Sequence, residues 1–280
     1  DSGITNGKVT VNKSVAAKDD NVTITVTPDE GHPLKKGSLK ATYENVGTQT
    51  LALTPGEGNT FTFTMPEANV TVTAEFADLV VTKNDGSDAI EGEDYEWPEA
   101  YSNHRLHIKK SGLTVSGKAT TESIEVGAGT ASDLTIENLT IDSTDSVAIN
   151  IWSNITSDFK LIVKGDNRLS VTQSVIGDST KGNPVILSGY LTVVGDGNLS
   201  LVGDQYHPAL KAQKDLTVSL SGKLTVDGGI CGTNDVSFTN SVGTVVAYAK
   251  EAYCGAIYSF GDFTFGEGVT CTVDAGYKTD

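Results

Sequence analysis

The sequence has few residues of the kinds that several common functions need. Its 280 residues include two arginines, Arg105 and Arg168, and its formal net charge is −16. Such a chain would be repelled by a phosphate backbone or an anionic membrane surface, so we expect no nucleic-acid binding. It also has no long apolar run, so we expect no membrane insertion by this segment.

Cysteine is scarce as well. Cys231, Cys254 and Cys271 do not make an even set, and none of them belongs to a C-x-x-C pair. We therefore expect small buried hydrophobic side chains rather than a disulfide framework. No signal peptide is visible, and a start at Asp1 is what a mature or trimmed extracellular fragment would show.

Helical periodicity is also missing. No long window places apolar residues at i, i+3, i+4 and i+7, whereas Val, Ile, Leu, Thr, Ser and Gly are abundant. This composition favours strands and tight turns, so we predict an all-β protein. The length allows one large or two ordinary domains.

Residues 1–77 alternate between apolar and polar side chains, which is typical of half-buried antiparallel strands. Turn-forming residues at 29–31 and 55–58 interrupt the alternation. We predict a small β-sandwich from these runs, which lie at 7–11, 21–26, 50–53, 60–65 and 69–76.

This segment resembles a known module. Residues 16–32 read A-x-x-x-D-x-V-T-I-T-V-T-P-D-E-G-H, and residues 59–76 read N-T-F-T-F-T-M-P-x-A-N-V-T-V-T-A-x-F. The order is similar to the small β-rich repeat of cell-surface proteins of Gram-positive bacteria. The resemblance covers residues 7–76 and implies a spacer or stalk without catalysis. We expect His32 to be a turn residue, because no second His, Cys or carboxylate cluster accompanies it.

From residue 78 a different pattern begins, made of short strands in pairs. In each pair the second strand starts eight residues after the first, and successive pairs start 20 to 30 residues apart. Leu134 and Leu139 begin the series with a shorter offset of five. The regular pairs start at Leu161 and Leu169, Leu191 and Leu199, Leu216 and Leu224, Val236 and Thr244, and Phe263 and Cys271.

A third short apolar element precedes each of the last three pairs by seven residues, starting at Ala209, Gly229 and Ala256. Three short strands per 20 to 30 residues are typical of a β-solenoid. We therefore predict a right-handed parallel β-helix over residues 78–280. Its ends need covers, and residues 78–112 are the candidate for the N-terminal one.

This second segment also resembles a family. The motifs that carry the resemblance are Gly92-x-Asp94-Tyr95, LTVSG at 113–117, I-x-V at 124–126, L-x-V-x-G-D-N-x-L at 161–169 and the repeated strand pairs. They are similar to the carbohydrate-binding β-helix domains of secreted and surface bacterial proteins, whose fold is akin to that of pectate lyases. The resemblance implies polysaccharide binding or adhesion. The chain departs from it at residues 211–212 and 258–259, where a glycine-rich turn is usual.

Acidic residues recur at equivalent places and could bind calcium. Asp215, Asp235 and Asp262 each precede the first strand of a pair, and Asp166 and Asp196 occupy matching turns. We expect each of them to terminate its turn by bonding its own backbone. The alternative is a Ca²⁺ site, because stacked carboxylates repel one another unless they splay apart or share a cation.

Aromatic residues are few, and four of them are candidates for stacking on sugar rings. Tyr206 and Tyr253 each stand three residues before a third element, two repeats apart, which would separate them by about 10 Å. Tyr95 and Trp97 lie in the aromatic loop 94–107. Packing at the corners and end of the stack is the alternative for all four, and for Trp152 we expect packing.

We predict an extracellular protein of the bacterial surface, from a Gram-positive organism, that binds a host or cell-wall polysaccharide as a monomer without catalysis. The alternatives are a protein-binding adhesin or stalk, and a calcium-dependent polysaccharide lyase or glycoside hydrolase. Such enzymes need clustered carboxylates, whereas the recurring carboxylates here occur singly in each repeat. Residues 78–280 carry 14 basic and 27 acidic side chains, a net charge of −13 that argues against an anionic glycan unless calcium bridges it.

Overall fold

The computed structural model shows an all-β protein, with no helix in the residues it describes. These are 4–29, 32–35, 37–98, 104–127, 131–143, 147–152, 158–171, 184–203, 207–239, 243–248 and 256–274. The chain divides into two compact units, residues 1–80 and residues 81–280. Within these ranges no helix is long and apolar enough to cross a membrane.

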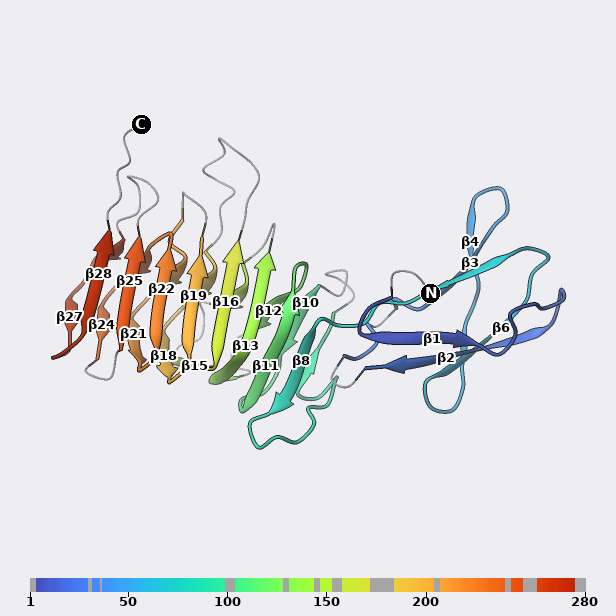
Figure 1. The fold of residues 1–280 in the computed structure, drawn as a ribbon, viewed down its shortest axis with the longest axis horizontal. Coiled ribbons are helices and arrows are strands. Elements are labelled where there is room, and N and C mark those ends of the chain that lie inside the picture. The colour runs from blue at the N-terminus through green and yellow to red at the C-terminus, as the bar shows by residue number, and fades with distance from the viewer. Residues whose placement is uncertain are drawn as a thin grey trace. The chain divides into compact units, whose positions relative to one another are not determined.

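The first unit consists of two antiparallel sheets (Figure 1). One has the order β1-β2-β6-β5 and the other the order β4-β3-β7. The strands are β1 Gly7–Val11, β2 Asn21–Pro28, β3 Lys40–Glu44, β4 Thr48–Thr50, β5 Thr54–Pro55, β6 Thr60–Thr64 and β7 Val70–Thr73.

Alternation along β2 builds the core of this unit. Val22, Ile24 and Val26 are buried, and the threonines between them are not. Ala41 and Phe63 of the other strands complete this core together with neighbouring apolar residues. The run at 50–53 is not a strand as predicted. Its leucines pack partly buried against the core from the segment between β4 and β5, and β3 was missed.

The second unit repeats three strand positions. The first position holds β10 Arg105–Ile108, β12 Ser123–Val126, β14 Ile149–Ile151, β17 Ile186–Ser188, β20 Leu210–Ala212, β23 Ile230–Gly232 and β26 Ile257–Ser259. The second holds β11 Leu113–Ala119, β13 Asp133–Ser143, β15 Phe159–Lys164, β18 Leu191–Gly195, β21 Leu216–Leu220, β24 Val236–Phe238 and β27 Phe263–Phe265. The third holds β16 Asp166–Val171, β19 Asn198–Val202, β22 Lys223–Asp227, β25 Thr244–Tyr248 and β28 Thr270–Asp274.

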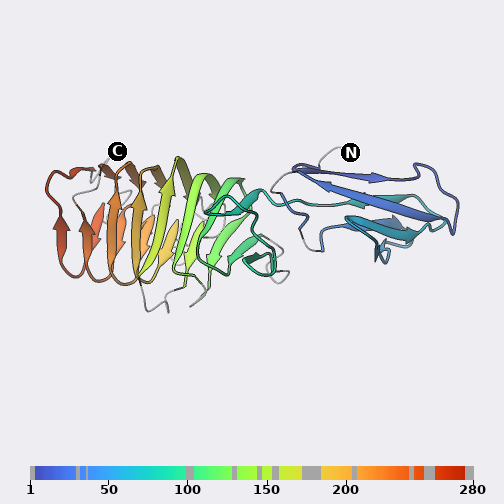
Figure 2. The ribbon, with the colours of Figure 1, turned by 90° about the horizontal axis from the view of Figure 1, so that it is seen from below.

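Each of these strands pairs in parallel with its counterpart in the next repeat, as the row of arrows in Figure 1 and the rungs in Figure 2 show. The described residues form an eight-stranded sheet at the first position and a thirteen-stranded sheet that contains the other two. At the start of the unit β8 Leu79–Lys83 pairs with β11, and β9 Tyr95–Glu96 pairs with β10 antiparallel. The result is a curled parallel sheet with buried rows of Leu, Ile and Val.

The irregular repeat at Leu134 and Leu139 is one continuous strand, β13. Its first half pairs with β15 and its second half with β16. Asn138 lies between the two halves with φ at 51°, a left-handed conformation that Asn tolerates better than most residues. The thirteen-stranded sheet therefore bends at β13, which joins its two arms.

Some predicted alignments are wrong in register. Leu161 pairs with Val193 rather than Leu191, and Leu169 pairs with Leu201 rather than Leu199, both shifts of two residues. Leu224 pairs with Val245 rather than Thr244, so the fourth pair has an offset of nine. A shift of two keeps the same side chains inside, so the hydrophobic pattern does not reveal it. The shift of one exchanges the faces and places Val245 and Ala247 inside.

Apolar side chains are partly exposed in the last described repeat. Phe263 and Phe265 occupy interior positions, opposite Val236 and Phe238, but are 41 % and 45 % exposed. Cys271 is only half-buried, as is Cys231, so the expectation of buried cysteines is wrong for these two. Neither forms a disulfide, and Cys254 lies outside the described residues.

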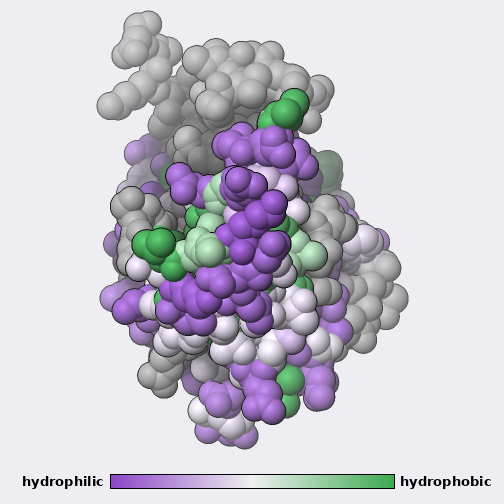
Figure 3. Space-filling model, turned by 90° about the vertical axis from the view of Figure 1, so that its right-hand side faces the viewer, coloured by the Kyte–Doolittle hydropathy of each residue, from purple (hydrophilic) through white to green (hydrophobic). Residues whose placement is uncertain are grey.

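The face of the molecule in Figure 3 is mainly hydrophilic, and its hydrophobic residues appear as separate spots. Isolated hydrophobic residues on a surface are normal and do not by themselves mark a binding site.

Candidate functional site

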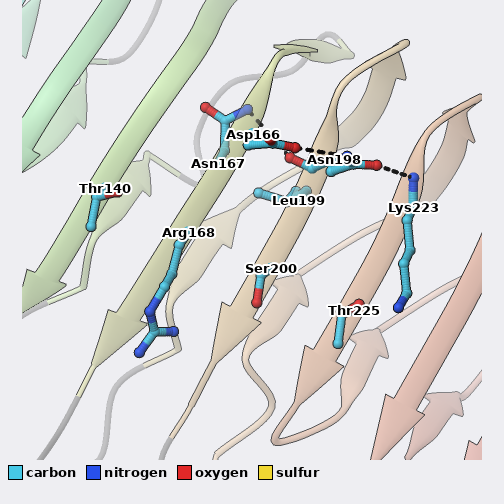
Figure 4. A pocket seen from close by; sticks show the side chains of 9 residues that line it. All are labelled: Thr140, Asp166, Asn167, Arg168, Asn198, Leu199, Ser200, Lys223 and Thr225. Carbon is cyan, nitrogen blue, oxygen red and sulfur yellow. Dashed lines mark hydrogen bonds between the residues drawn. The ribbon is translucent and has the colours of Figure 1, made fainter.

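A groove of about 330 Å³ lies on the outer face of the third strand position, across β16, β19 and β22 (Figure 4). Its lining combines amides, hydroxyls and both kinds of charge. The residues are Thr140, Asp166, Asn167, Arg168, Asn198, Leu199, Ser200, Lys223 and Thr225.

Parallel register brings these residues together although they are far apart in the sequence. Arg168 pairs with Ser200, and Ser200 pairs with Thr225. The alternate residues Leu169, Leu201 and Val226 are buried, so Arg168, Ser200 and Thr225 face outward. The outer face therefore presents one polar side chain from each repeat, with a step of about 4.8 Å between strands.

A ladder of side-chain hydrogen bonds fixes one edge of the groove. The Asp166 backbone N–H donates to Asn138 Oδ1 at 3.1 Å, and Asn198 Nδ2 donates to Asp166 Oδ1 at 2.7 Å. The Lys223 backbone N–H then donates to Asn198 Oδ1 at 2.9 Å. Figure 4 shows the bonds from Asp166 through Asn198 to Lys223. The ladder joins four repeats and holds the strand starts in register.

Gly165 makes room for this ladder. Its φ is 62°, and a Cβ atom there would lie only 2.3 Å from Asn138 Oδ1. Any side chain at this position would meet both backbone strain and a steric clash with the first acceptor of the ladder.

Asn167 anchors the groove from inside. Its side chain is buried, its Nδ2 donates to the Lys164 carbonyl at 2.8 Å, and its Oδ1 accepts from the Leu139 N–H at 3.0 Å. A buried amide is tolerated when its polar atoms are hydrogen-bonded, as they are here. Leu199 and Leu224 take the equivalent position in the next two repeats.

The groove carries two cationic side chains and one carboxylate. Arg168 Nη2 lies 3.6 Å from Asp142 Oδ1, at the side of the groove. Lys223 is exposed, and its Nζ has no ion-pair partner within the described part of the chain. Asp166 is the single acid in the lining. The groove is therefore slightly cationic within a strongly acidic chain.

Two of the four predicted sugar-stacking residues are buried. Tyr95 is 6 % exposed and Trp97 is 2 % exposed, so neither ring offers a face to a ligand. Burial raises the pKa of Tyr95 to about 12, with a smaller contribution from Glu91 and Asp94. Both residues pack at the start of the parallel unit, which is the alternative role that the sequence left open. Tyr206 and Tyr253 lie outside the described residues, so their stacking stays a prediction.

The first row of predicted calcium ligands bonds the backbone. The Asp262 N–H donates to Asp235 Oδ1 at 2.8 Å, and the Asp235 N–H lies 3.4 Å from Asp215 Oδ1. The carboxylates of Asp215 and Asp235 thus face the backbone of the following repeat, whereas the prediction was that each bonds the backbone of its own turn. Among the described residues no group of three or more His, Cys, Asp or Glu side chains could hold a metal ion.

The second predicted calcium pair is not aligned in space. Asp166 pairs with Asn198, whereas Asp196 lies exposed in the turn before β19. The two-residue register shift between β15 and β18 causes this separation. Asp166 Oδ1 accepts a hydrogen bond from the Asn198 side-chain amide, so this oxygen is less available to a cation.

Of the residues that line the groove, the sequence singled out only Asp166 as a site residue, and as a calcium ligand; the others are of types common on exposed strands. The available signal was that these residues occupy equivalent positions in successive repeats, but it can be used only when the register is known. Sequence reasoning also missed two exposed aromatic sites. Tyr258 and Phe260 form an edge-to-face pair with ring centroids 4.8 Å apart, and Trp152 is 47 % exposed rather than packed.

Comparison with known proteins identifies part of the chain. Residues 2–79 match the family described as divergent InlB B-repeat domain, a bacterial surface repeat module. No match was found among curated proteins or solved structures. The presence of this module indicates a bacterial surface or adhesin-like protein.

Proposed function

We propose that the second unit is a right-handed parallel β-helix that binds polysaccharide without catalysis. Three strand positions that repeat with parallel pairing support the closed helix. Connections between parallel strands are right-handed in nearly all proteins, which supports the handedness. We place its N-terminal cover at residues 78–112, where β8, β9 and β10 bury Leu79, Tyr95 and Leu106.

The groove across β16, β19 and β22 is the proposed binding site, and its construction is the observation that carries the proposal. It is open along the stack, and it offers hydrogen-bond donors and acceptors from successive repeats. A linear polymer of sugars presents hydroxyls at regular intervals, which suits a surface whose polar groups recur at each strand.

Binding without catalysis fits the residues of the groove. Glycoside hydrolysis generally uses two carboxyl groups on either side of the scissile bond. The described lining holds one, Asp166, which accepts a hydrogen bond from Asn198. We further propose that the first unit is a spacer that displays the groove outside a Gram-positive cell.

A protein-binding adhesin is the second candidate. The observation that favours it is the exposed pair Tyr258 and Phe260, because exposed aromatic residues are enriched at protein interfaces. This pair lies on and just after β26, at the first strand position, and outside the groove.

Glycan arrays probed with the whole chain test the proposal. The double variant Ser200→Ala/Thr225→Val removes two neighbouring hydroxyls from the groove and should weaken glycan binding about thirtyfold, since each hydrogen bond contributes about 1 kcal/mol. The control Ser237→Ala/Thr217→Val makes the same changes at paired outward positions of β24 and β21, and should bind normally. An array without any signal, or equal losses in both variants, would contradict polysaccharide binding in this groove.

A further inference from the structure

The total charge of the protein and the charge of the groove have opposite signs. Residues 81–280 contain 14 Lys and Arg against 26 Asp and Glu. The groove lining instead holds Arg168 and Lys223 against the single acid Asp166. At physiological ionic strength charges are screened beyond about 8 Å, so a ligand in the groove is influenced mainly by these nearby side chains.

The donors of both cationic side chains remain accessible. The Arg168 side chain is 49 % exposed, and its ion pair with Asp142 is a single contact at 3.6 Å. Asp142 Oδ1 also accepts a hydrogen bond from Ser170 Oγ at 2.5 Å. A guanidinium has five N–H donors, so one long contact leaves several for a ligand. Lys223 contributes an exposed ammonium group.

The carboxylate of the groove is oriented by the protein. Asp166 Oδ1 accepts the Asn198 amide at 2.7 Å, at the edge where the ladder runs. Figure 4 shows Arg168 extending along its strand away from this edge, on the opposite side from Asp166. An anionic ligand beside Arg168 would therefore be separated from Asp166, and Asp142 would be the carboxylate that shares the guanidinium with it.

The spacing of the two cations sets a period for the ligand. Arg168 is on β16 and Lys223 is on β22, with β19 between them. Two strand steps amount to about 10 Å across the sheet, and the two residues differ by about 7 Å along the strand direction. The separation across the strands is comparable with the length of a disaccharide unit. Asn198 and Ser200 lie between the two cations and offer neutral hydrogen-bonding groups.

We propose that the ligand of this groove is an acidic polysaccharide with one carboxylate in each disaccharide. Arg168 binds one carboxylate and Lys223 the next, while the hydroxyls and amides between them bind the intervening sugar. This inference rests on the proposed function and specifies its ligand. It differs from the expectation based on total charge, because the cations act directly and calcium is not required.

The test measures binding of the whole chain to hyaluronate and to fully methyl-esterified hyaluronate by isothermal titration calorimetry. The two polymers share a backbone and differ in charge. We expect hyaluronate to bind at least tenfold more tightly, with an affinity that falls as salt is added and does not change with a calcium chelator. Arg168→Gln and Lys223→Gln should each weaken hyaluronate binding about tenfold, and should weaken binding of the ester much less.

Lys160→Gln is the matched control, because Lys160 is an exposed residue of β15 outside the groove and carries the same charge change. Equal affinity for both polymers, or equal effects of all three variants, would overturn the acidic ligand but leave polysaccharide binding standing. Binding of hyaluronate that disappears with chelator would also overturn it, in favour of a calcium bridge. If the glycan arrays and both polymers give no binding, the proposed function itself fails.

Discussion

The two units of this chain use similar strand sequences in different ways. In residues 1–80 the run NVTITV forms β2 and pairs antiparallel with β1 and β6, around one cluster of buried residues. In residues 81–280 the run LTVSL forms β21 and pairs in parallel with β18 and β24. Alternation determines which side chains are buried, while the connections decide the direction and identity of the partner strand.

The difference has an energetic consequence. The core of the first unit closes on itself, so each buried residue contributes to one cooperative structure. The second unit is nearly one-dimensional, because each repeat contacts only its neighbours. A residue in a middle repeat has neighbours on both sides, whereas a residue in the last described repeat is partly exposed, as Phe263 is.

The largest expected effect compares two phenylalanines in one row of the second unit. Phe159 and Phe263 occupy the same position four repeats apart, linked by Leu191, Leu216 and Val236. Phe159 is fully buried, so Phe159→Ala should lower the free energy of unfolding by about 3–5 kcal/mol. Phe263→Ala should cost less, because much of that ring is already exposed. Urea titrations of both variants measure the difference, and equal losses would contradict a one-dimensional stack.

A substitution in the first unit tests whether the two units unfold independently. Ile24 is fully buried in the core of β2, and Ile24→Ala should destabilise that unit by about 2–5 kcal/mol. In calorimetry, the thermal transition of residues 1–80 should move and that of residues 81–280 should stay. Thr25→Ala, at the next and outward position, is the control and should change little. Coupled shifts of both transitions would show one cooperative protein instead of two units.

The smallest expected effect concerns acid stability at the start of the second unit. Asp94 accepts hydrogen bonds from Lys110 Nζ at 2.8 Å and from the Ile90 N–H at 2.9 Å, and it lies 3.3 Å from Lys83. These contacts, that of Lys110 above all, lower the pKa of Asp94 to about 2. Since this pKa is below the ordinary value of 3.8, the stabilisation is complete above pH 3.8 and is lost as the pH falls toward 2.

Asp94→Asn should therefore flatten the loss of stability between pH 4 and 2, as measured by urea unfolding across that range. Lys110→Gln removes the main cause and should flatten it similarly, and the double variant should add little to either single one. If a variant loses as much stability between pH 4 and 2 as the unsubstituted protein does, Asp94 titrates normally in the folded protein.

The sequence predicted much of the fold because its signals are local. Period-2 alternation located β1, β2 and β6 almost to the residue, and the repeated Leu-Thr-Val runs located β21 and β22. The prediction failed where two registers bury the same face. The apolar pattern is then the same whether Leu161 pairs with Leu191 or, as in the structure, with Val193. The strand β3 was missed since its alternation is short and only Ala41 is fully buried.

The candidate site was less predictable than the fold. The ring types of Tyr95 and Trp97 suggest sugar stacking, but exposure depends on what packs over the rings, and both are buried. Arg168 is distinguished in the sequence only as one of two arginines. Its partners in the groove, Ser200 and Thr225, are 32 and 57 residues away in sequence and meet it through two successive strand pairings.

Local sequence signals establish an all-β chain, a change of pattern near residue 78 and the interior rows of the repeated strands, because alternation and turn chemistry act over a few residues. The register, and with it the outer surface, is set only when the strands pair. Inward side chains are selected by burial and tolerate a two-residue shift, so the apolar pattern is the same in either register. The polar outer face, in contrast, differs between the two registers. Because Asp166 pairs with Asn198 rather than Asp196, the hydrogen-bond ladder forms and Arg168 lies beside Ser200.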